Sequence, residues 1–353
     1  MIRLHTDRQM VKFVAAKVVI NSFYSFTYAY DSLKKLPMVQ NTEILYQAPL
    51  QGFTDFTWRK TFNQVYGGVT KYYIPYLAFG KGREIKKSQL KEVFPENNQG
   101  MQAIPQVLFS DAAELMELTF TLVGYGYREI NLNLGCPYPM ATNRGRGAAW
   151  LEKPQALKEV LGLLFEKTEG VKFSVKLRAG MENSENNLSI FEVLNDLPLE
   201  EIIFHPRTAR QMYTGKADAQ LFARALPMVK HPMVYNGDIF SLDDLQQLKA
   251  LIPQQQHWMT GRGLLINPSL ALRLNGQVMD EATEKQKRKA FHDHLMQEYA
   301  ERLQGSGHLL AKMNQFWVYF SESFENPHKA MKMVKKAGSV IKYNAAVAEI
   351  FRS

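Results

Sequence analysis

A chain of 353 residues is long enough to bury a large core, in one large α/β domain or in two domains. Its 46% hydrophobic and 22% charged residues exclude general disorder, and its net charge of +9 favours a polyanionic partner. The single cysteine excludes an intrachain disulfide framework and a structural zinc site built from thiolates alone, so we expect a reducing compartment and a cytoplasmic protein.

We interpret residues 1–40 as an N-terminal extension. Residues 13–30 are apolar and aromatic, but polar residues such as Lys17 interrupt them and no small-residue cleavage pattern follows, so we expect no signal peptide. No apolar run reaches the roughly 20 residues that a membrane span needs, and we expect no membrane association. Because Met38 stands just before the first clear strand, we hypothesise that translation begins there.

From residue 43 onward, short apolar runs alternate with segments of helical periodicity. Eight runs are predicted to be strands: 44–48, 69–74, 103–108, 129–134, 173–177, 201–204, 232–235 and 257–260. Residues that favour helix starts, such as Asp111, Pro154 and Ser241, open the segments between them. Alternation of this kind implies a parallel sheet with right-handed crossovers. Eight units match a closed (β/α)8 TIM barrel, whose usual size is roughly 250 residues, and we assign the barrel to residues 41–278.

An open, doubly wound sheet is the alternative fold. A dinucleotide-binding sheet of that kind carries Gly-x-Gly-x-x-Gly after its first strand, and this chain does not. The barrel is therefore favoured.

Chemically distinctive residues lie at the carboxyl ends of the predicted strands, the face on which TIM barrels build their active sites. They are Pro49, Leu50, Gln51, Gln106, Asn133, Cys136, Lys176, Arg178, His205, Asn236, Gly237, Asp238, Gly261 and Arg262. The stretches 236–238 and 261–263 would offer backbone N–H groups and one cation, which suits a phosphate. Each stretch is also compatible with an ordinary turn.

The chemical roles of Cys136 and Lys176 are considered separately from those of the other candidate residues. A lone cysteine is more often a small buried hydrophobe than a reactive group, although basic neighbours such as Arg144 suit a reactive thiol, and both interpretations stay open here. A lysine inside a barrel strand needs an anionic or strongly accepting partner. No metal site is expected, because the eight histidines include no His-x-x-x-His pair, and no Gly-x-Ser-x-Gly elbow supports a hydrolase.

Residues 279–353 show helical periodicity without further strands, and we assign them to a separate helical domain. Its last part carries lysines at near-helical spacing: Lys329, Lys332, Lys335, Lys336 and Lys342. Such a pattern is typical of a solvated helix face, and beside a catalytic barrel it also suits a polyanion.

Seven motifs, taken together, resemble the flavin-dependent tRNA-dihydrouridine synthases, most closely the bacterial branch. They are APLQGFTD (48–55), NLGCP (133–137), GRGAAWL (145–151), VKLRAG (175–180), HPRTARQMYTGKAD (205–218), NGD (236–238) and GRGLLINP (261–268). The chain departs from the family pattern at Leu50, where Met is frequent, at Pro139, where a basic residue is common, and at Pro206, where Gly is usual.

The resemblance implies FMN at the mouth of the barrel, with each candidate residue taking the role of its counterpart in the family. Pro49, Leu50 and Gln51 would line the flavin, and Gln106 and Lys176 would bond its ring. His205 would contact the ribityl chain or the phosphate. The stretches 236–238 and 261–262 would hold the phosphate.

The resemblance also implies the reaction: reduction of D-loop uridines in tRNA, with NADPH or NADH as the reductant. Cys136 would donate a proton to C5 of the uracil ring, and Asn133 and Arg178 would contact the base. Residues 279–353 would grip tRNA, and we expect a monomer.

Two rival functions remain at this stage. One is an FMN barrel enzyme that reduces a small molecule, which would need no basic helical domain. The other is an RNA-binding protein with a vestigial flavin site, and the intact set of Cys136, Lys176, His205 and Arg262 argues against it.

Overall fold

The computed structural model describes residues 43–80, 82–182 and 188–352. The proposed N-terminal extension and the hypothetical start at Met38 lie outside these residues.

Eight parallel strands close into a barrel in which each strand pairs with the next and β8 pairs with β1. The strands are β1 (Ile44–Gln47), β2 (Lys71–Leu77), β3 (Ala103–Val107), β4 (Glu129–Leu134), β5 (Lys172–Arg178), β6 (Ile202–His205), β7 (Met233–Asn236) and β8 (His257–Thr260). The predicted TIM barrel is therefore confirmed. The bounds of β4 and β8 match the prediction, whereas β2, β6 and β7 begin and end later along the chain than expected, β2 by the most residues.

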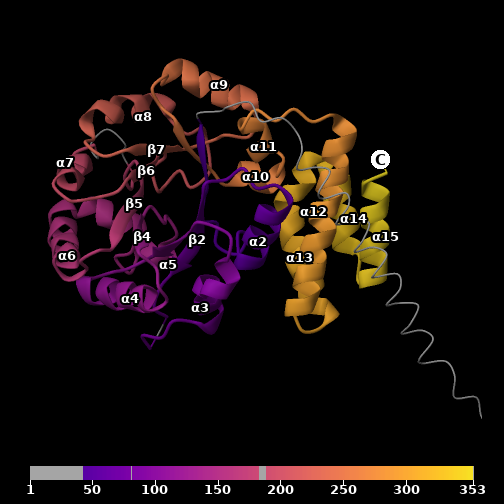
Figure 1. Ribbon diagram of the computed structural model, residues 1–353, viewed down its shortest axis with the longest axis horizontal. Helices are drawn as coiled ribbons and strands as arrows, with labels where there is room; N and C mark the ends of the chain where they lie inside the picture. The colour runs from indigo at the N-terminus through magenta and orange to yellow at the C-terminus, as the bar shows by residue number, and fades with distance from the viewer. Residues whose placement is uncertain (1–42, 81, 183–187, 353) are drawn as a thin grey trace, which may run out of the picture. The chain divides into compact units, whose positions relative to one another are not determined.

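Helices lie outside the strands (Figure 1). They are α2 (Phe56–Val65), α3 (Lys87–Val93), α4 (Ala112–Gly124), α5 (Pro139–Thr142), α6 (Pro154–Lys167), α7 (Ile190–Asn195), α8 (Ala219–Ala225), α9 (Leu242–Leu251), α10 (Arg262–Ile266) and α11 (Leu270–Leu274). Short 3-10 turns add η1 (Pro95–Asn98), η2 (Gly147–Glu152) and η4 (Leu226–Met228). The expected helix starts are confirmed: Asp111 and Ser241 cap α4 and α9 with their side chains, and Pro154 is the first residue of α6.

The amino-terminal end of the barrel is closed by a buried polar cluster around Glu201. The Tyr46 hydroxyl donates to one carboxylate oxygen of Glu201 at 3.0 Å, and the Tyr73 hydroxyl donates to the other. Lys71 pairs with Glu201 at 3.1 Å and with Glu129 at 2.6 Å. Because every carboxylate oxygen of Glu201 has a partner, this end is a structural plug, and the chemistry is left to the opposite end.

The predicted helical C-terminal region is confirmed. It consists of α12 (Glu281–Arg302), α13 (Ser306–Phe320), the 3-10 turn η5 (Ser321–Ser323), α14 (Pro327–Lys336) and α15 (Val340–Ile350). His292 lies buried at its centre, where its Nε2 is 2.7 Å from the Tyr343 hydroxyl, which also accepts from Trp317 Nε1 at 2.8 Å. Burial lowers the pKa of His292, so this histidine is a neutral core residue.

The helical region and the barrel share one hydrophobic core and belong to one compact unit. Helix α12 packs on α2, where Phe291 meets Trp58 and Phe62 edge-on. The division of the chain at residue 278 stays a prediction. Within the described residues, no helix has both the length and the apolar surface that a bilayer crossing requires.

Candidate active site

A cavity of about 670 Å³ opens at the carboxyl ends of the strands. It is lined by every candidate residue except Asp238: Pro49, Leu50, Gln51, Gln106, Asn133, Cys136, Lys176, Arg178, His205, Asn236, Gly237, Gly261 and Arg262. The parallel barrel explains this convergence, because the carboxyl ends of all eight strands meet at one face.

Cys136 lies in the cavity wall with only 7% of its surface exposed. Burial raises the pKa of its thiol, and hydrogen bonding from the Tyr138 backbone N–H, the charge of Arg178 and the Tyr76 hydroxyl offset this only in part. The thiol is therefore protonated at neutral pH. In this state Cys136 is suited to give up a proton rather than to attack as a thiolate.

Gly147 lets the following segment close over Cys136. The φ angle of Gly147 is +62°, and a Cβ atom added there would lie 2.7 Å from the Cβ atom and the carbonyl oxygen of Cys136. That carbonyl accepts from the Ala148 backbone N–H at 3.1 Å. Only glycine fits this approach, so the GRG stretch shapes the back of the thiol site.

A chain of buried and half-buried amides runs through the barrel interior to the Cys136 turn. Asn133 Oδ1 accepts from the backbone N–H groups of residues 135–136 at 3.0 and 2.8 Å, so its Nδ2 must donate, and it does so to Gln106 Oε1 at 2.7 Å. Gln106 Nε2 then donates to Asn131 Oδ1 at 2.7 Å, and Asn131 Nδ2 donates to Ser174 Oγ at 2.8 Å. Two backbone N–H groups thus fix the orientation of every amide in the chain.

This amide chain uses most of the hydrogen-bonding capacity of two candidate residues. Asn133 has one N–H left for a base, and Gln106 has one N–H left for a flavin ring. Both residues also hold the turn that carries Cys136. The sequence predicted their places but not this second role.

Lys176 lies in the cavity wall without a counter-ion. None of the described residues forms a hydrogen bond or an ion pair with its ammonium group. Burial, together with the charge of Arg178, lowers the pKa of Lys176 to about 7. An unpaired lysine in such a place fits the prediction that it needs an anionic or strongly accepting ligand.

Arg178 ties the Cys136 turn to the loop after β6. Its Nε donates to the Gly135 carbonyl at 3.1 Å, and its Nη1 donates to the carbonyls of Thr208 and Met212 at 2.9 and 2.8 Å. Its guanidinium carbon lies 5.6 Å from the centre of the Tyr213 ring. Arg178 is therefore a fixed cation at the wall, near the thiol.

His205 lines the cavity and carries a hydrogen-bond acceptor that has no partner. Its Nδ1 is 2.5 Å from the Asn236 carbonyl, which can only accept, so Nδ1 carries the proton. Burial and the charges of Arg178 and Lys176 hold the pKa of His205 well below its usual value, so the ring is neutral. Its Nε2 is buried without a partner, which is the state expected of an atom that awaits a donor on a ligand.

Asp238 does not line the cavity. Its carboxylate accepts from Arg207 at 3.0 and 2.5 Å, from Arg262 at 2.8 Å and from the Ala217 N–H at 3.0 Å. A carboxylate beside a phosphate would repel it, whereas here the carboxylate orients Arg262. Its position therefore suits a supporting role rather than the cofactor contact that the resemblance implies.

The cavity also has aromatic walls that the sequence analysis did not assign to the site. They come from Phe53, Tyr76, Phe79, Tyr138, Tyr213, Phe240 and Tyr319. Tyr213 lies within the HPRTARQMYTGKAD motif, which could have drawn attention to it. Tyr319 belongs to α13, and no sequence signal links that helix to the barrel mouth.

The residues present fit an anionic cofactor such as FMN. An unpaired lysine and the Arg262 cation suit negative charge, and the orphaned Nε2 of His205 suits a hydroxyl or N–H group. The described residues contain no cluster of three or more His, Cys, Asp or Glu side chains that could hold a metal ion.

Comparison with known proteins agrees with this chemistry. A "Probable tRNA-dihydrouridine synthase" from Helicobacter pylori is 28% identical over 236 residues, which cover 65% of this chain and 69% of the relative. A "tRNA-dihydrouridine(16) synthase" from Neisseria meningitidis is 28% identical over 242 residues, which cover 67% and 72%.

Among solved structures, histamine dehydrogenase from Rhizobium sp. 4-9 superposes with a TM-score of 0.51 at 10% identity, over 76% of this chain and 51% of that one. This likeness shows the barrel fold alone. The family model "Dihydrouridine synthase (Dus)" matches residues 46–350, which is most of the chain and confirms the resemblance found in the sequence. The chain therefore belongs to the dihydrouridine synthase family of flavin-dependent oxidoreductases.

Proposed function

We propose that this chain is a tRNA-dihydrouridine synthase that uses FMN and a reduced nicotinamide to reduce D-loop uridines. One observation carries the proposal: a protonated, buried thiol and a lysine without a counter-ion face the same cavity. The thiol supplies an acid, and the lysine supplies a place for an electron-rich ligand.

The chain's own residues would hold FMN at several points. Lys176 and the free N–H of Gln106 would bond the flavin ring, while His205 Nε2 would accept from a ribityl hydroxyl. Arg262, oriented by Asp238, would balance the phosphate charge. Once bound and reduced, the flavin would supply a hydride to C6 of a uracil ring.

Cys136 would complete the reduction from its side of the base. The S–H bond breaks, a C5–H bond forms, and the electron pair of the S–H bond stays on sulfur as a thiolate. The Tyr138 backbone N–H, the Arg178 cation and the Tyr76 hydroxyl would stabilise this thiolate. A proton from water then restores the thiol, and the base leaves as dihydrouridine.

Two features support tRNA as the substrate. The reacting uridine must leave its stack to enter the cavity, and half-exposed Tyr138 and Tyr213 offer aromatic faces at the cavity wall. In addition, five exposed lysines on α14 and α15 have no ion-pair partner among the described residues, and we call this set the basic face: Lys329, Lys332, Lys335, Lys336 and Lys342. Phosphates would balance these charges.

Several details of the proposal stay predictions: NADPH or NADH as the reductant, a monomeric state and a cytoplasmic location. Some relatives carry the name tRNA-dihydrouridine(16) synthase, so position 16 is the first site to examine.

In the test, the purified protein is loaded with FMN and incubated either with tRNA that lacks dihydrouridine or with free uracil and uridine. Each substrate is tested with NADPH and with NADH as the reductant. The proposal predicts dihydrouridine in tRNA and reductant consumption that increases when tRNA is added. Reduction of the free pyrimidine with untouched tRNA would instead identify a small-molecule reductase.

A further inference from the structure

The loop between β1 and α2 forms one wall of the cavity and also contacts the helical region. Pro49, Leu50, Gln51 and Phe53 line the cavity. Gly52, between Gln51 and Phe53, has a φ of +84°, and its carbonyl accepts from Lys312 Nζ of α13 at 2.7 Å. No other described residue donates to this carbonyl. Lys312 therefore extends from the helical region and holds the loop within its cavity-lining part.

Lys312 is itself fixed by Asp55, which lies at the far end of the same loop. The two side chains pair at 3.1 Å, and Asp55 also accepts from Tyr299 at 2.8 Å and from Arg302 at 3.1 Å. Although burial alone would raise it, the charges of Lys312 and Arg302 hold the pKa of Asp55 below its usual value. A charged, buried carboxylate with several donors is a rigid anchor, because loss of one partner leaves charge uncompensated.

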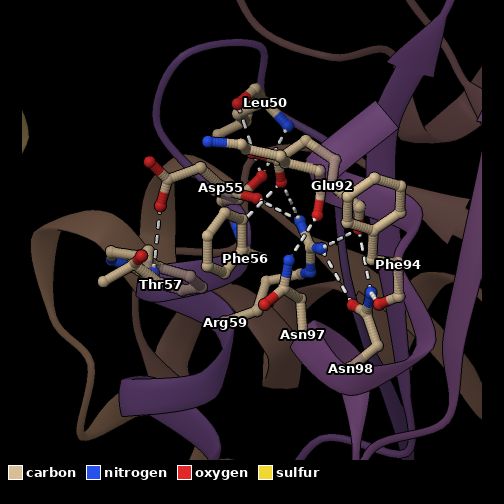
Figure 2. A network of polar contacts seen from close by, with 12 residues as sticks. Leu50, Asp55, Phe56, Thr57, Arg59, Glu92, Phe94, Asn97 and Asn98 are labelled. Atoms are coloured by element: carbon tan, nitrogen blue, oxygen red, sulfur yellow. Dashed lines mark hydrogen bonds and ion pairs between the residues drawn. The ribbon is translucent and has the colours of Figure 1, made fainter. Parts of the chain in front are cut away.

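The barrel side holds the later part of the loop (Figure 2). Arg59 is fully buried and donates to the Thr54 carbonyl at 2.7 Å and to Glu92 at 3.0 Å, and Glu92 also accepts from the Phe56 backbone N–H at 2.7 Å. These bonds fix residues 54–56, but none reaches Gly52. The cavity-lining part of the loop is thus left to its internal bonds and to α13.

Three residues of α13 face this loop. Lys312, Gln315 and Tyr319 stand at positions i, i+3 and i+7, which share one side of a helix. Gln315 Nε2 would lie 2.9 Å from a Cβ atom on Gly52, so the two segments are in close contact. The Tyr319 ring packs edge-on against Phe53, with ring centres 4.9 Å apart, and it lines the cavity.

We propose that α13 is part of the flavin site and that Lys312 is a positioning residue, which sets the cavity-lining loop 49–53 through the Gly52 carbonyl and Asp55. This inference rests on the proposed function, since the cavity must hold the flavin. The helical region would then contribute to cofactor binding as well as to RNA binding. Without Lys312, the Gly52 carbonyl loses the one hydrogen bond that a described residue makes to it, and the wall against which the flavin would lie becomes less ordered.

A second lysine provides a matched control. Lys60 of α2 pairs with Glu298 of α12 at 3.2 Å, so it also joins the barrel to the helical region. Its side chain is 43% exposed, and it touches neither the loop nor the cavity. Lys60→Met therefore removes the same charge from the same interface without affecting Gly52.

The experiment measures the FMN dissociation constant by flavin fluorescence, with melting temperatures alongside, for the parent, Lys312→Met, Lys312→Arg and Lys60→Met. Loss of a charge-assisted hydrogen bond predicts on the order of 10-fold weaker FMN binding for Lys312→Met. Lys60→Met should bind as the parent does. Lys312→Arg, which can still donate to the carbonyl and to Asp55, should recover most of the affinity.

Unchanged FMN binding in Lys312→Met would overturn the proposal, and so would an equal loss in Lys60→Met, because that result would indicate general loosening of the interface. If Lys312→Met does not fold, the FMN dissociation constant of Tyr319→Leu is measured instead. Weaker FMN binding by Tyr319→Leu supports a role for α13, and parent-like binding refutes it. A parent protein that takes up no FMN would instead refute the proposed function, and this inference with it.

Discussion

Lys176 provides the most quantitative prediction, because its charge depends on whether a ligand is present. With a pKa of about 7 in the flavin-free protein, the ammonium form makes up about half of the molecules at pH 7 and about one in a hundred at pH 9. A flavin bound at Lys176 favours the charged form and raises its pKa again. If that pKa returns to near 10, FMN binding should weaken by about 50-fold between pH 7 and pH 9.

The sign of this effect follows from linkage. Binding takes up a proton wherever free Lys176 is neutral, so affinity is highest below about pH 7 and falls as the pH rises. The assay is flavin fluorescence at pH 7, 8 and 9, a range above the second phosphate pKa of about 6. Riboflavin, which lacks the phosphate, should show the same slope if Lys176 contacts the ring.

Lys176→Met is the matched variant. Its FMN affinity should be about 10- to 100-fold lower at pH 7 and nearly independent of pH. Without flavin, the variant should be more stable than the parent, because the parent holds a lysine whose charged form is disfavoured by up to about 5 kcal/mol. A parent with no pH slope, or a variant that keeps the slope, would refute the reasoning.

Three further predictions concern the thiol turn and the substrate. Asn131→Leu breaks the amide chain behind Gln106, and dihydrouridine formation should fall more than FMN affinity does; equal losses would contradict a role in placing Cys136. Gly147→Ala forces a Cβ atom against Cys136 at positive φ, so we expect about 1–3 kcal/mol lower stability from denaturant unfolding, and an unchanged midpoint would be inconsistent with this contact. Replacing the basic face by glutamine should lower the slope of log affinity for tRNA against log salt by up to about 1 per lysine, without affecting FMN binding; an unchanged slope would place the tRNA elsewhere.

The barrel could be predicted from the sequence because each of its strands is a short apolar run between helical segments. The largest error in the predicted strand bounds concerns β2. The predicted second strand ends at residue 74, directly before Pro75, a residue that lacks the N–H used by a sheet ladder. In the structure, β2 continues to Leu77, and its pairing with β3 shifts register between Ile74 and Leu77. Tyr76, which lies within hydrogen-bonding reach of the Cys136 thiol, falls in the part that was missed.

The candidate site, too, could be predicted only in part. Residues at strand ends could be placed from the sequence, because the topology brings those ends together. Hydrogen-bond partners could not be foreseen, since Asp238 faces Arg207 and Arg262 only after the loops have packed. Tyr319 comes from a helix that follows the barrel, so only tertiary contacts bring it to the cavity.

The most direct test of the account is a single turnover on tRNA that lacks dihydrouridine, with enzyme whose FMN has been reduced beforehand, followed by mass spectrometry at nucleotide resolution. The parent should form dihydrouridine at one or a few D-loop positions. Cys136→Ala should bind FMN and tRNA as the parent does and lose most of the product, because alanine has no proton to donate to C5. Full product from Cys136→Ala, at the same positions and rate, would contradict the central claim that this thiol delivers the proton.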